Sequence, residues 1–391
     1  MNARLLIVLA LLGIVVLLSL SGQGPARLMV VAGHPAPTAT STSIDVLVTV
    51  TPTSTLTVTL TSTATDTPPT ETAISTPIAA PRGANYLPIV LNPGGAAPTT
   101  TATAGPSPTA PPTGQIPAFS HVFIIVMENH EYSSVISNTA APYFNSLAQQ
   151  YGLATNFYAI RHPSLPNYLA LTGGSTFSVT NDCTSCFINA PNLVDQLETA
   201  GKSWKAYMEG MPSPCFLGDN NKTKYVQKHN PFIYYDDIRL DPVRCNQIVP
   251  FTQFTQDLTA SIVPDFAWIT PDMCHDTHDC PVSTGDVWLQ SIVPQILASP
   301  AWQQNGVLFI TYDEGSTTMG CCTVASGGHI ATVVISPLGK TAYQSAVPYH
   351  HYSLLRTIEE AWGLPLLNGA NCDCSQPMAD FFTLPPTGKR P

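Results

Sequence analysis

A segment rich in Thr and Pro limits how much of this 391-residue chain can build a packed core. Between Pro35 and Thr113 nearly half of the residues are Thr or Pro, and few are charged. Such a stretch has too little apolar surface to offset the conformational entropy that folding costs. From Pro117 onward the chain has aromatic residues, hydrophobic periodicity and enough length for one large domain. We therefore predict a disordered Thr/Pro-rich linker over residues 23–116 and a folded domain over residues 117–391.

The N-terminal residues have the pattern of an export signal. Arg4 precedes an apolar run from Leu5 to Leu20, and small and polar residues follow the run. The run is slightly shorter than the ~20 residues that a membrane-spanning helix needs. We predict that residues 1–22 are either a signal peptide or an N-terminal membrane anchor, so that the folded part is secreted or anchored at the extracellular surface.

The cysteines favour disulfide bonds in an exported domain. All ten lie in the folded part, between Cys183 and Cys374, and an even number in close pairs is typical of disulfides. The close pairs are Cys183/Cys186, Cys274/Cys280, Cys321/Cys322 and Cys372/Cys374. The alternative is a zinc site, because Cys183 and Cys186 have C-x-x-C spacing, but no second such pair lies at zinc-finger distance.

The charge distribution argues against nucleic acid as a partner. After residue 117 the chain carries 12 basic and 22 acidic residues, which accounts for the whole formal net charge of −10. Nucleic-acid binding depends on cationic side chains that contact phosphates, and this domain has no run of Lys or Arg. The composition is still compatible with an acidic cluster that binds a metal ion.

Alternating strand and helix patterns predict an α/β fold. Short apolar runs of the kind buried on both faces of a sheet occur at residues 121–127, 266–270, 306–312 and 331–336, with a further strand candidate at 204–207. Helical patterns occur at residues 143–151, 166–172, 192–199 and 352–362. Strands interleaved with helices imply a mostly parallel sheet with helices on both faces.

Polar residues that suit a metal ion lie at the ends of these apolar runs. Glu128 and Asn129 follow the first run, and Asp313 and Glu314 follow the third. The loop after the second run contains Asp272, His275, Asp276, His278 and Asp279, and His329 precedes the last run. Ligands bind beyond the carboxyl ends of strands in open parallel sheets, so we expect these groups at one edge. Together they favour a divalent metal ion; the alternative for any one of them is a solvated loop residue or a helix cap.

Ser164 lies where a helix is predicted to begin. Pro166 suits the first helical turn, where a missing N–H costs nothing. A hydroxyl at this place meets free backbone N–H groups and the positive end of the helix dipole, which favours phosphate binding and a serine nucleophile. The alternative is that Ser164 only caps the helix.

Motifs of several other enzyme classes are missing from the sequence. There is no G-x-S-x-G segment, which disfavours an α/β-hydrolase. There is also no G-x-G-x-x-G or G-x-x-x-x-G-K-[ST] segment, so a nucleotide cofactor and a P-loop have no support.

Five motifs in order along the folded part resemble the phosphoesterase family of secreted acid phosphatases and phospholipases C. They are a strand followed by Glu-Asn-His, the segment His-Pro-Ser-Leu-Pro-Asn-Tyr, a strand with Tyr-Asp-Glu-Gly, Gly-His followed by Val-Val-Ile-Ser-Pro, and His-Tyr-Ser-Leu-Leu-Arg-Thr-Ile-Glu. The similarity spans residues 119–367. The segment 164–173 is also similar to the nucleophile turn of nucleotide pyrophosphatase/phosphodiesterases, where Thr replaces Ser. Both families belong to the alkaline-phosphatase-like superfamily, which implies that fold here.

The resemblance implies roles for particular residues. It makes Ser164 the nucleophile, with Asn167 of the same motif among the catalytic residues. It implies the metal ligands Glu128, Asn129, Asp313 and Glu314. It places His275, with His278 or Asp272, in a loop that stabilises the phosphoryl group or protonates the leaving oxygen. It implies His329 and His351 less strongly, and the alternative for His351 is that it only packs at the closing helix. One divalent metal ion of unknown identity is expected, and a second is left open because the histidine-bearing loop carries two cysteines.

The expected function is that of an exported, metal-dependent phosphoesterase that hydrolyses phosphate monoesters through a serine nucleophile, as a monomer. In-line attack would give a phosphoserine that water then hydrolyses. The nearest alternative is a phosphodiesterase of the phospholipase C type. An alternative of another class is a non-catalytic surface protein whose stalk presents the domain for adhesion. The insert over residues 207–248 is expected to roof the pocket.

Overall fold

The computed structural model describes residues 116–383 and, before them, the backbones of five strands. These strands are β1 (Arg4–Leu9), β2 (Ile14–Ser19), β3 (Leu28–Ala32), β4 (Ile44–Val50) and β5 (Leu56–Ser62). β1, β2 and β3 form an antiparallel sheet, and β4 pairs antiparallel with β5. They belong to one unit of the chain, Met1–Thr99, and Thr100–Pro391 forms a second unit.

The N-terminal predictions fall mostly outside the described residues. The apolar run from Leu5 to Leu20 includes β1 and β2, and no helix that the structure describes is long and apolar enough to cross a membrane. The signal peptide or anchor over residues 1–22 stays a prediction. Of the linker predicted over residues 23–116, the structure describes β3, β4, β5 and Ile116, and the rest lies outside the described residues.

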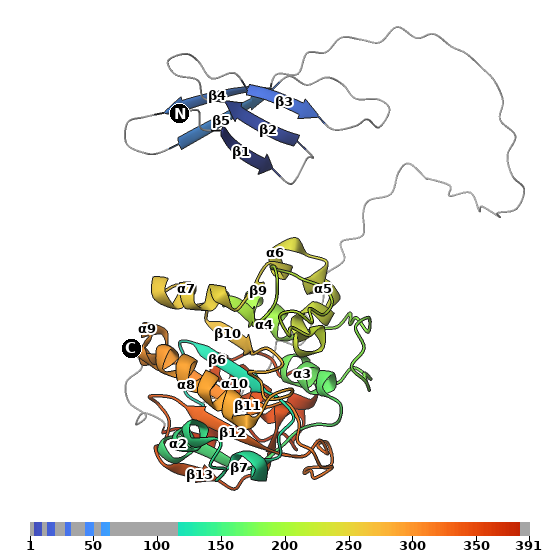
Figure 1. Cartoon of the computed structure of the whole chain (residues 1–391), viewed down its shortest axis with the longest axis vertical. Coiled ribbons are helices and arrows are strands. Elements are labelled where there is room, and N and C mark those ends of the chain that lie inside the picture. Colours follow the sequence, from blue (N-terminus) through green and yellow to red (C-terminus); the bar gives the residue numbers. More distant parts are fainter. Residues whose placement is uncertain are drawn as a thin grey trace, which may run out of the picture. The chain divides into compact units, whose positions relative to one another are not determined.

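The second unit is built on a nine-stranded sheet (Figure 1). Along the sheet the order is β13 (Tyr343–Ser345), β7 (Gly152–Tyr158), β12 (His329–Ile335), β11 (Val307–Tyr312), β6 (Val122–Met127), β10 (Phe266–Thr270), β8 (Trp204–Met208) and β9 (Ile248–Pro250), with β14 (Tyr349–His350) paired to β7. Only β12 runs antiparallel to its neighbours in this sheet, which confirms the predicted mostly parallel arrangement. Because β12 is reversed, its first residue, His329, lies at the edge where the other strands end.

The central strands are buried along their whole length, in agreement with their continuous apolar sequences. Every residue of β6, β10 and β11 is buried, as expected for parallel strands covered on both faces. The last residue of β6, Met127, lies beside the last residue of β11, Tyr312. Because the two strands end side by side, Glu128 and Asp313 follow them as neighbours.

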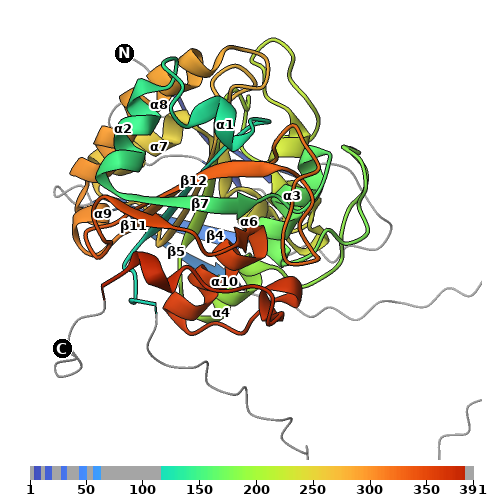
Figure 2. The same cartoon turned by 90° about the horizontal axis from the view of Figure 1, so that it is seen from below.

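Helices cover both faces of the sheet. Figure 2 shows α2 (Pro142–Gln150) and α8 (Val282–Ala298) on one side of the sheet and α10 (His351–Trp362) on the other. α2 packs against α8, and α10 packs against α3 (Ser164–Gly173). The remaining α-helices are α1 (Tyr132–Val135), α4 (Leu193–Thr199), α5 (Asp236–Arg239), α6 (Pro242–Cys245), α7 (Thr252–Ala260) and α9 (Pro300–Gln303). Short 3-10 segments are η1 (Gln227–His229), η2 (Pro231–Tyr234), η3 (Asn368–Asn371) and η4 (Ala379–Phe381).

The helices expected from the sequence match α2, α3, α4 and α10 to within two residues. β7 and α8 were not among the predicted elements. β7 contains Thr155 and Asn156 amid its apolar residues, and Gly285 and Pro294 interrupt the helical pattern of α8. Packing of α8 on α2 holds this helix in spite of those two residues.

All ten cysteines are paired in the described part of the chain. The bonds are Cys183–Cys186, Cys215–Cys245, Cys274–Cys280, Cys321–Cys322 and Cys372–Cys374. The four close pairs predicted from the sequence are therefore disulfides, and the zinc alternative for Cys183 and Cys186 is not supported.

Candidate active site

The segments that follow β6, β10 and β11 meet at one place on the edge of the sheet. Asp313 N donates to Met127 O (2.8 Å), and Glu128 N donates to Asp276 O (2.8 Å). Asn129 N donates to Asp313 Oδ1 (3.0 Å). Polar residues that are far apart in the chain are thus direct neighbours at the ends of these strands.

Ser164 is the first residue of α3, and its side chain faces this edge. It is 1% exposed, and Pro163 occupies the N-cap position before it. Ser164 Oγ donates to Glu128 Oε2 (3.2 Å) and lies 3.5 Å from Glu314 Oε1. The hydroxyl therefore lies between carboxylates that follow two different strands, and the N-cap residue Pro163 makes no side-chain capping hydrogen bond.

Asn167, predicted to be catalytic, holds the turn that precedes Ser164. Its Oδ1 accepts from Ile160 N (2.9 Å) and Arg161 N (3.1 Å). Its Nδ2 donates to Arg161 O (2.6 Å) and Pro163 O (3.2 Å). All four partners are backbone groups, so Asn167 is a positioning residue that fixes the path of the chain into α3.

The carboxylates around Ser164 are buried without enough positive charge to balance them. Burial raises the pKa of Asp313 to about 7 and that of Glu314 to about 7. Burial, and then the negative charges of Asp313 and Asp276, raise the pKa of Glu128 well above its usual range. Such a cluster is stable either with protons on some of the groups or with a bound cation.

The oxygen atoms of this cluster fit a divalent metal ion. Asp313 Oδ2 is buried and has no hydrogen-bond partner among the described residues. The side-chain oxygen of Asn129 faces two other acceptors, Asp313 Oδ1 (3.3 Å) and Glu314 Oε1 (3.0 Å). Oxygen atoms repel one another at such distances. The contact becomes favourable if the amide rotates so that its nitrogen donates, or if a cation lies between the oxygens. The donor set of Glu128, Asn129, Asp313 and Glu314 is the one that hard divalent cations prefer.

His229 and Asp276 complete the site. Asp276 was among the strand-end groups expected at this edge, but no individual role was predicted for it, and His229 was not predicted. His229 comes from η1, in the insert between β8 and β9, and is 2% exposed. Its Nε2 lies 3.2 Å from Glu128 Oε2, and its Nδ1 lies 3.4 Å from Asp276 Oδ2. Glu128, His229 and Asp276 are one of two groups in the described residues whose ligand atoms lie within 4.8 Å of one another.

Burial and stacking hold the His229 ring. The ring stacks on Tyr168 of α3 with centroids 5.3 Å apart, and Tyr168 OH donates to Glu128 Oε1. Burial, together with the positive charge of Lys228, lowers the pKa of His229 well below its usual range. The ring is therefore neutral at pH 7 and can hold a proton on one nitrogen only. No motif in the sequence marks His229; the one available signal was that the insert was expected to cover the site.

The three histidines predicted to be catalytic lie in different surroundings. His278 reaches the site, because its Nε2 lies 3.2 Å from the Asn129 amide. His275 instead contacts Glu209 (2.9 Å from Nδ1 to Oε2), and these two form the second potential ligand group with Asp272. His329 stacks on Tyr132, and its Nε2 lies 2.8 Å from Thr155 O. The structure thus brings only His278 of the three against the carboxylate cluster.

Two further histidines support the residues at the strand ends. His351, the weaker candidate from the sequence, donates from Nε2 to Asp313 O (2.6 Å) at the start of α10. His162 bridges Glu314 Oε2 (2.6 Å from Nδ1) and Thr317 O (2.9 Å from Nε2). A carbonyl can only accept, so His162 Nε2 carries a hydrogen and Nδ1 faces the carboxylate. These contacts hold the backbone of Asp313 and the side chain of Glu314.

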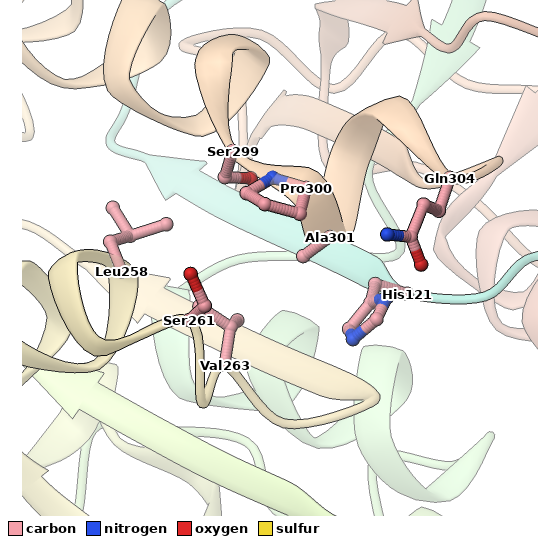
Figure 3. Close-up of a pocket in the computed structure, with 8 residues that line it drawn as sticks. All are labelled: His121, Leu258, Ser261, Val263, Ser299, Pro300, Ala301 and Gln304. Atoms are coloured by element: carbon pink, nitrogen blue, oxygen red, sulfur yellow. The ribbon is translucent and has the colours of Figure 1, made fainter.

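A separate cavity of about 230 Å³ lies at the other end of the sheet (Figure 3). Figure 3 shows His121, which directly precedes β6, beside Gln304 and across from Ser261. Because β6 carries His121 at its start and Glu128 after its end, the cavity and the carboxylate cluster are at opposite edges. The site beyond the carboxyl ends of the strands is the one expected for this architecture.

The chain resembles solved structures of low sequence identity. One is a protein in the alkaline phosphatase superfamily from Vibrio parahaemolyticus, with 12% identity and a TM-score of 0.45 over 66% of this chain and 71% of that one. Another is a phosphonate monoester hydrolase from Silicibacter pomeroyi, with 13% identity and a TM-score of 0.41 over 69% of this chain and 78% of that one.

Sequence relatives are more similar. An acid phosphatase of Aspergillus fumigatus is 34% identical over 65% of this chain and 57% of its own length. A phosphatidylinositol-3-phosphatase of Mycobacterium tuberculosis is 32% identical over 64% of this chain and 79% of its own length. A hemolytic phospholipase C of Pseudomonas aeruginosa is 24% identical over 57% of this chain and 39% of its own length. The chain spans about three-fifths of the length of the acid phosphatases that it matches.

A family model extends over most of the second unit. The model of the phosphoesterase family matches residues 134–365, which is more than half of the chain and includes Ser164, Asp313 and Glu314. On this match, the chain belongs to the phosphoesterase family.

Proposed function

We propose that this chain hydrolyses phosphate monoesters, with Ser164 as the nucleophile and a divalent metal ion as cofactor. The observation that carries the proposal is the buried Ser164 hydroxyl, which faces carboxylates on two sides at the start of α3. Relatives named acid phosphatase support the reaction class. The serine nucleophile and the metal are supported by the geometry of the site alone.

A metal ion would be held by Glu128, Asn129, Asp313 and Glu314. When bound there, the ion would neutralise the carboxylates, offset the negative charge of the phosphoryl group and lower the pKa of the serine hydroxyl.

The reaction then follows from the residues beside Ser164. Ser164 Oγ attacks phosphorus, the P–Oγ bond forms, and the bond from phosphorus to the leaving oxygen breaks as that oxygen takes up a proton. Water attacks the resulting phosphoserine, the P–Oγ bond breaks, and inorganic phosphate and the Ser164 hydroxyl are released.

His229 is the group best suited to transfer the proton. Its Nε2 faces Glu128 Oε2, the same oxygen atom that accepts from Ser164 Oγ. Its Nδ1 lies 3.4 Å from Asp276 Oδ2. When Nδ1 carries the hydrogen, Nε2 presents its lone pair to the site. His278, next to Asn129, is the second candidate for the proton transferred to the leaving oxygen.

A second candidate function is that of a phosphodiesterase of the phospholipase C type, which the hemolytic phospholipase C among the relatives supports. A non-catalytic adhesion protein fits less well, because a nucleophile, acidic ligands and an Asp–His pair all occupy one buried site. For the cellular location we propose export, supported by the apolar N-terminal run and the five disulfides.

The test is hydrolysis of p-nitrophenyl phosphate by the full-length chain and by Ser164→Ala. We expect Ser164→Ala to lower kcat by at least ~10³-fold, because the reaction then has no nucleophile. A chelator should abolish activity, and added divalent metal should restore it. Ser291→Ala, at an exposed position of α8, serves as a control and should keep the parent rate.

Parent-like hydrolysis by Ser164→Ala, or full activity in chelator, would show that the mechanism is wrong. Parallel assays with bis-p-nitrophenyl phosphate and phosphatidylcholine separate the two candidate functions. A monoesterase prefers the first substrate, and an enzyme of the phospholipase C type prefers the diesters.

A further inference from the structure

Lys228 and Asp182 form an ion pair at the start of the nucleophile helix. Lys228 Nζ lies 3.0 Å from Asp182 Oδ2, and Leu165 N, one residue after Ser164, donates to Asp182 Oδ1 (3.0 Å). The two side chains are 20% and 25% exposed, so the pair is neither in the core nor free in solvent. Asp182 thus ties the ammonium group of Lys228 to the first turn of α3.

The charge of Lys228 acts on the carboxylates around Ser164. Burial raises the pKa of Glu128 and of Glu314, and the positive charge of Lys228 opposes this effect in both. In return Asp182, Glu128 and Asp313 keep the pKa of Lys228 above its usual value, so the ammonium group stays charged. Lys228 therefore carries a permanent positive charge next to the site.

Two other cations, Arg161 and Lys224, make different contacts. Arg161 Nε donates to the carbonyl of His162 (3.4 Å), and its charge acts on Tyr352. Lys224 lies 3.6 Å from Cys280 Sγ, in the histidine-bearing loop. Among these three cations, Lys228 is the one linked, through Asp182, to the helix that carries Ser164.

We propose that Lys228, positioned by Asp182, binds the phosphoryl oxygens of the substrate and makes the site selective for phosphate monoesters over diesters. A monoester dianion has three non-bridging oxygens and one more negative charge than a diester, so an additional ammonium group stabilises it more. Asp182 keeps the ammonium group at the first turn of α3 when no substrate is bound. This inference rests on the proposed function, because it concerns the same serine and the same substrate.

The test compares two esters in the full-length chain and in Lys228→Met. The kcat/KM is measured for p-nitrophenyl phosphate and for bis-p-nitrophenyl phosphate, together with the inhibition constant of inorganic phosphate. We expect Lys228→Met to lower kcat/KM for the monoester by roughly 10²-fold, the usual effect of removing one group that stabilises developing charge. The diester should lose roughly tenfold or less, and phosphate should inhibit more weakly.

Three further variants control for structural effects. Lys202→Met removes an ion pair of the same 3.0 Å length, Lys202 to Asp265, with similar exposure, at the opposite edge of the sheet; its ester preference should equal that of the parent. Lys228→Arg keeps the charge and should keep most of the preference. Asp182→Asn should shift the ratio of the two kcat/KM values in the same direction as Lys228→Met, because it releases the ammonium group without removing it.

Equal losses for both esters in Lys228→Met, or no loss for either, would overturn the inference. So would an unchanged inhibition constant for phosphate. Failure of the proposed function gives a different result. Ser164→Ala and the chelated protein would then keep activity toward both esters, with either Lys or Met at residue 228.

Discussion

At the residue scale, the site depends on pairs of side chains that come from distant segments. His229 lies between Glu128, which follows β6, and Asp276, which follows β10. Asp276 is fully buried, and burial raises its pKa well above the usual range. Burying a polar group in this way costs folding free energy. A carboxyl group 3.4 Å from a ring nitrogen is close enough to influence which nitrogen of the histidine carries the hydrogen.

Replacement of Asp276 by Asn tests this role. An Asn side chain can present its amide nitrogen to His229 Nδ1, and Nδ1 then accepts that hydrogen bond. The hydrogen of the imidazole therefore sits on Nε2, and Nε2 cannot act as a base. We expect Asp276→Asn to lower kcat for p-nitrophenyl phosphate by about 10²-fold or more, with a small change in KM.

Asp286 offers a buried control for that variant. It is 5% exposed and accepts from Tyr143 N and Phe144 N at the start of α2, away from the carboxylate cluster. Asp286→Asn should lower the melting temperature and leave kcat close to that of the parent. If Asp276→Asn behaves in the same way, Asp276 serves stability and not proton transfer.

At the element scale, the loop between β11 and β12 is shaped around one carboxylate. Glu131 accepts from Ser316 N (2.8 Å), Thr317 N (3.2 Å) and His329 N (3.0 Å), so it joins both ends of the loop to the segment after β6. These hydrogen bonds lower its pKa although burial opposes them. The loop directly follows Glu314, and its path therefore decides where that carboxylate points.

Gly328→Ala should disturb this loop and the site with it. Gly328 has φ +98°, and a Cβ there would lie 2.7 Å from Gly315 Cα, the residue after Glu314. We expect a loss of stability well above the ~1 kcal/mol that an Ala at positive φ costs by itself, together with a clear fall in kcat.

Gly201 is the matched position for that experiment. It has φ +69°, and nothing lies within 4 Å of a Cβ added there. Gly201→Ala should cost about 1 kcal/mol, with kcat unchanged. Urea unfolding and p-nitrophenyl phosphate hydrolysis measure both quantities, and similar results for the two variants would contradict the role given to the loop.

At the scale of the whole molecule, the five disulfides do not contribute equally. Cys215–Cys245 spans 30 positions of the insert that carries His229, whereas the other four bonds join cysteines six or fewer positions apart. In the chain-entropy account, a bond stabilises more when it closes a longer loop of the unfolded chain.

Removal of Cys215–Cys245 should therefore have the largest effect. We expect Cys215→Ala/Cys245→Ala to lower the free energy of unfolding by about 4 kcal/mol, and Cys183→Ala/Cys186→Ala by about 2 kcal/mol. Urea titration of both double variants provides the measurement. The ranking is wrong if the short-loop variant proves the less stable of the two.

The core of the fold and part of the site follow from the sequence alone. The apolar runs of β6, β10 and β11 indicate burial on both faces, and such strands form a parallel sheet whose ends meet at one edge. That rule brings Glu128 and Asp313 together without any knowledge of coordinates. It works because burial and strand periodicity are properties of short segments.

Tertiary packing decided the rest. His229 reaches Glu128 only because the insert between β8 and β9 folds back over the strand ends, and no local pattern in that insert encodes the contact. His275 and His329 were predicted from their strand-end positions and from the family resemblance, yet His275 contacts Glu209 and His329 stacks on Tyr132. The position of a residue in the chain limits where its Cα lies. The direction of its side chain depends on neighbours that are remote in sequence.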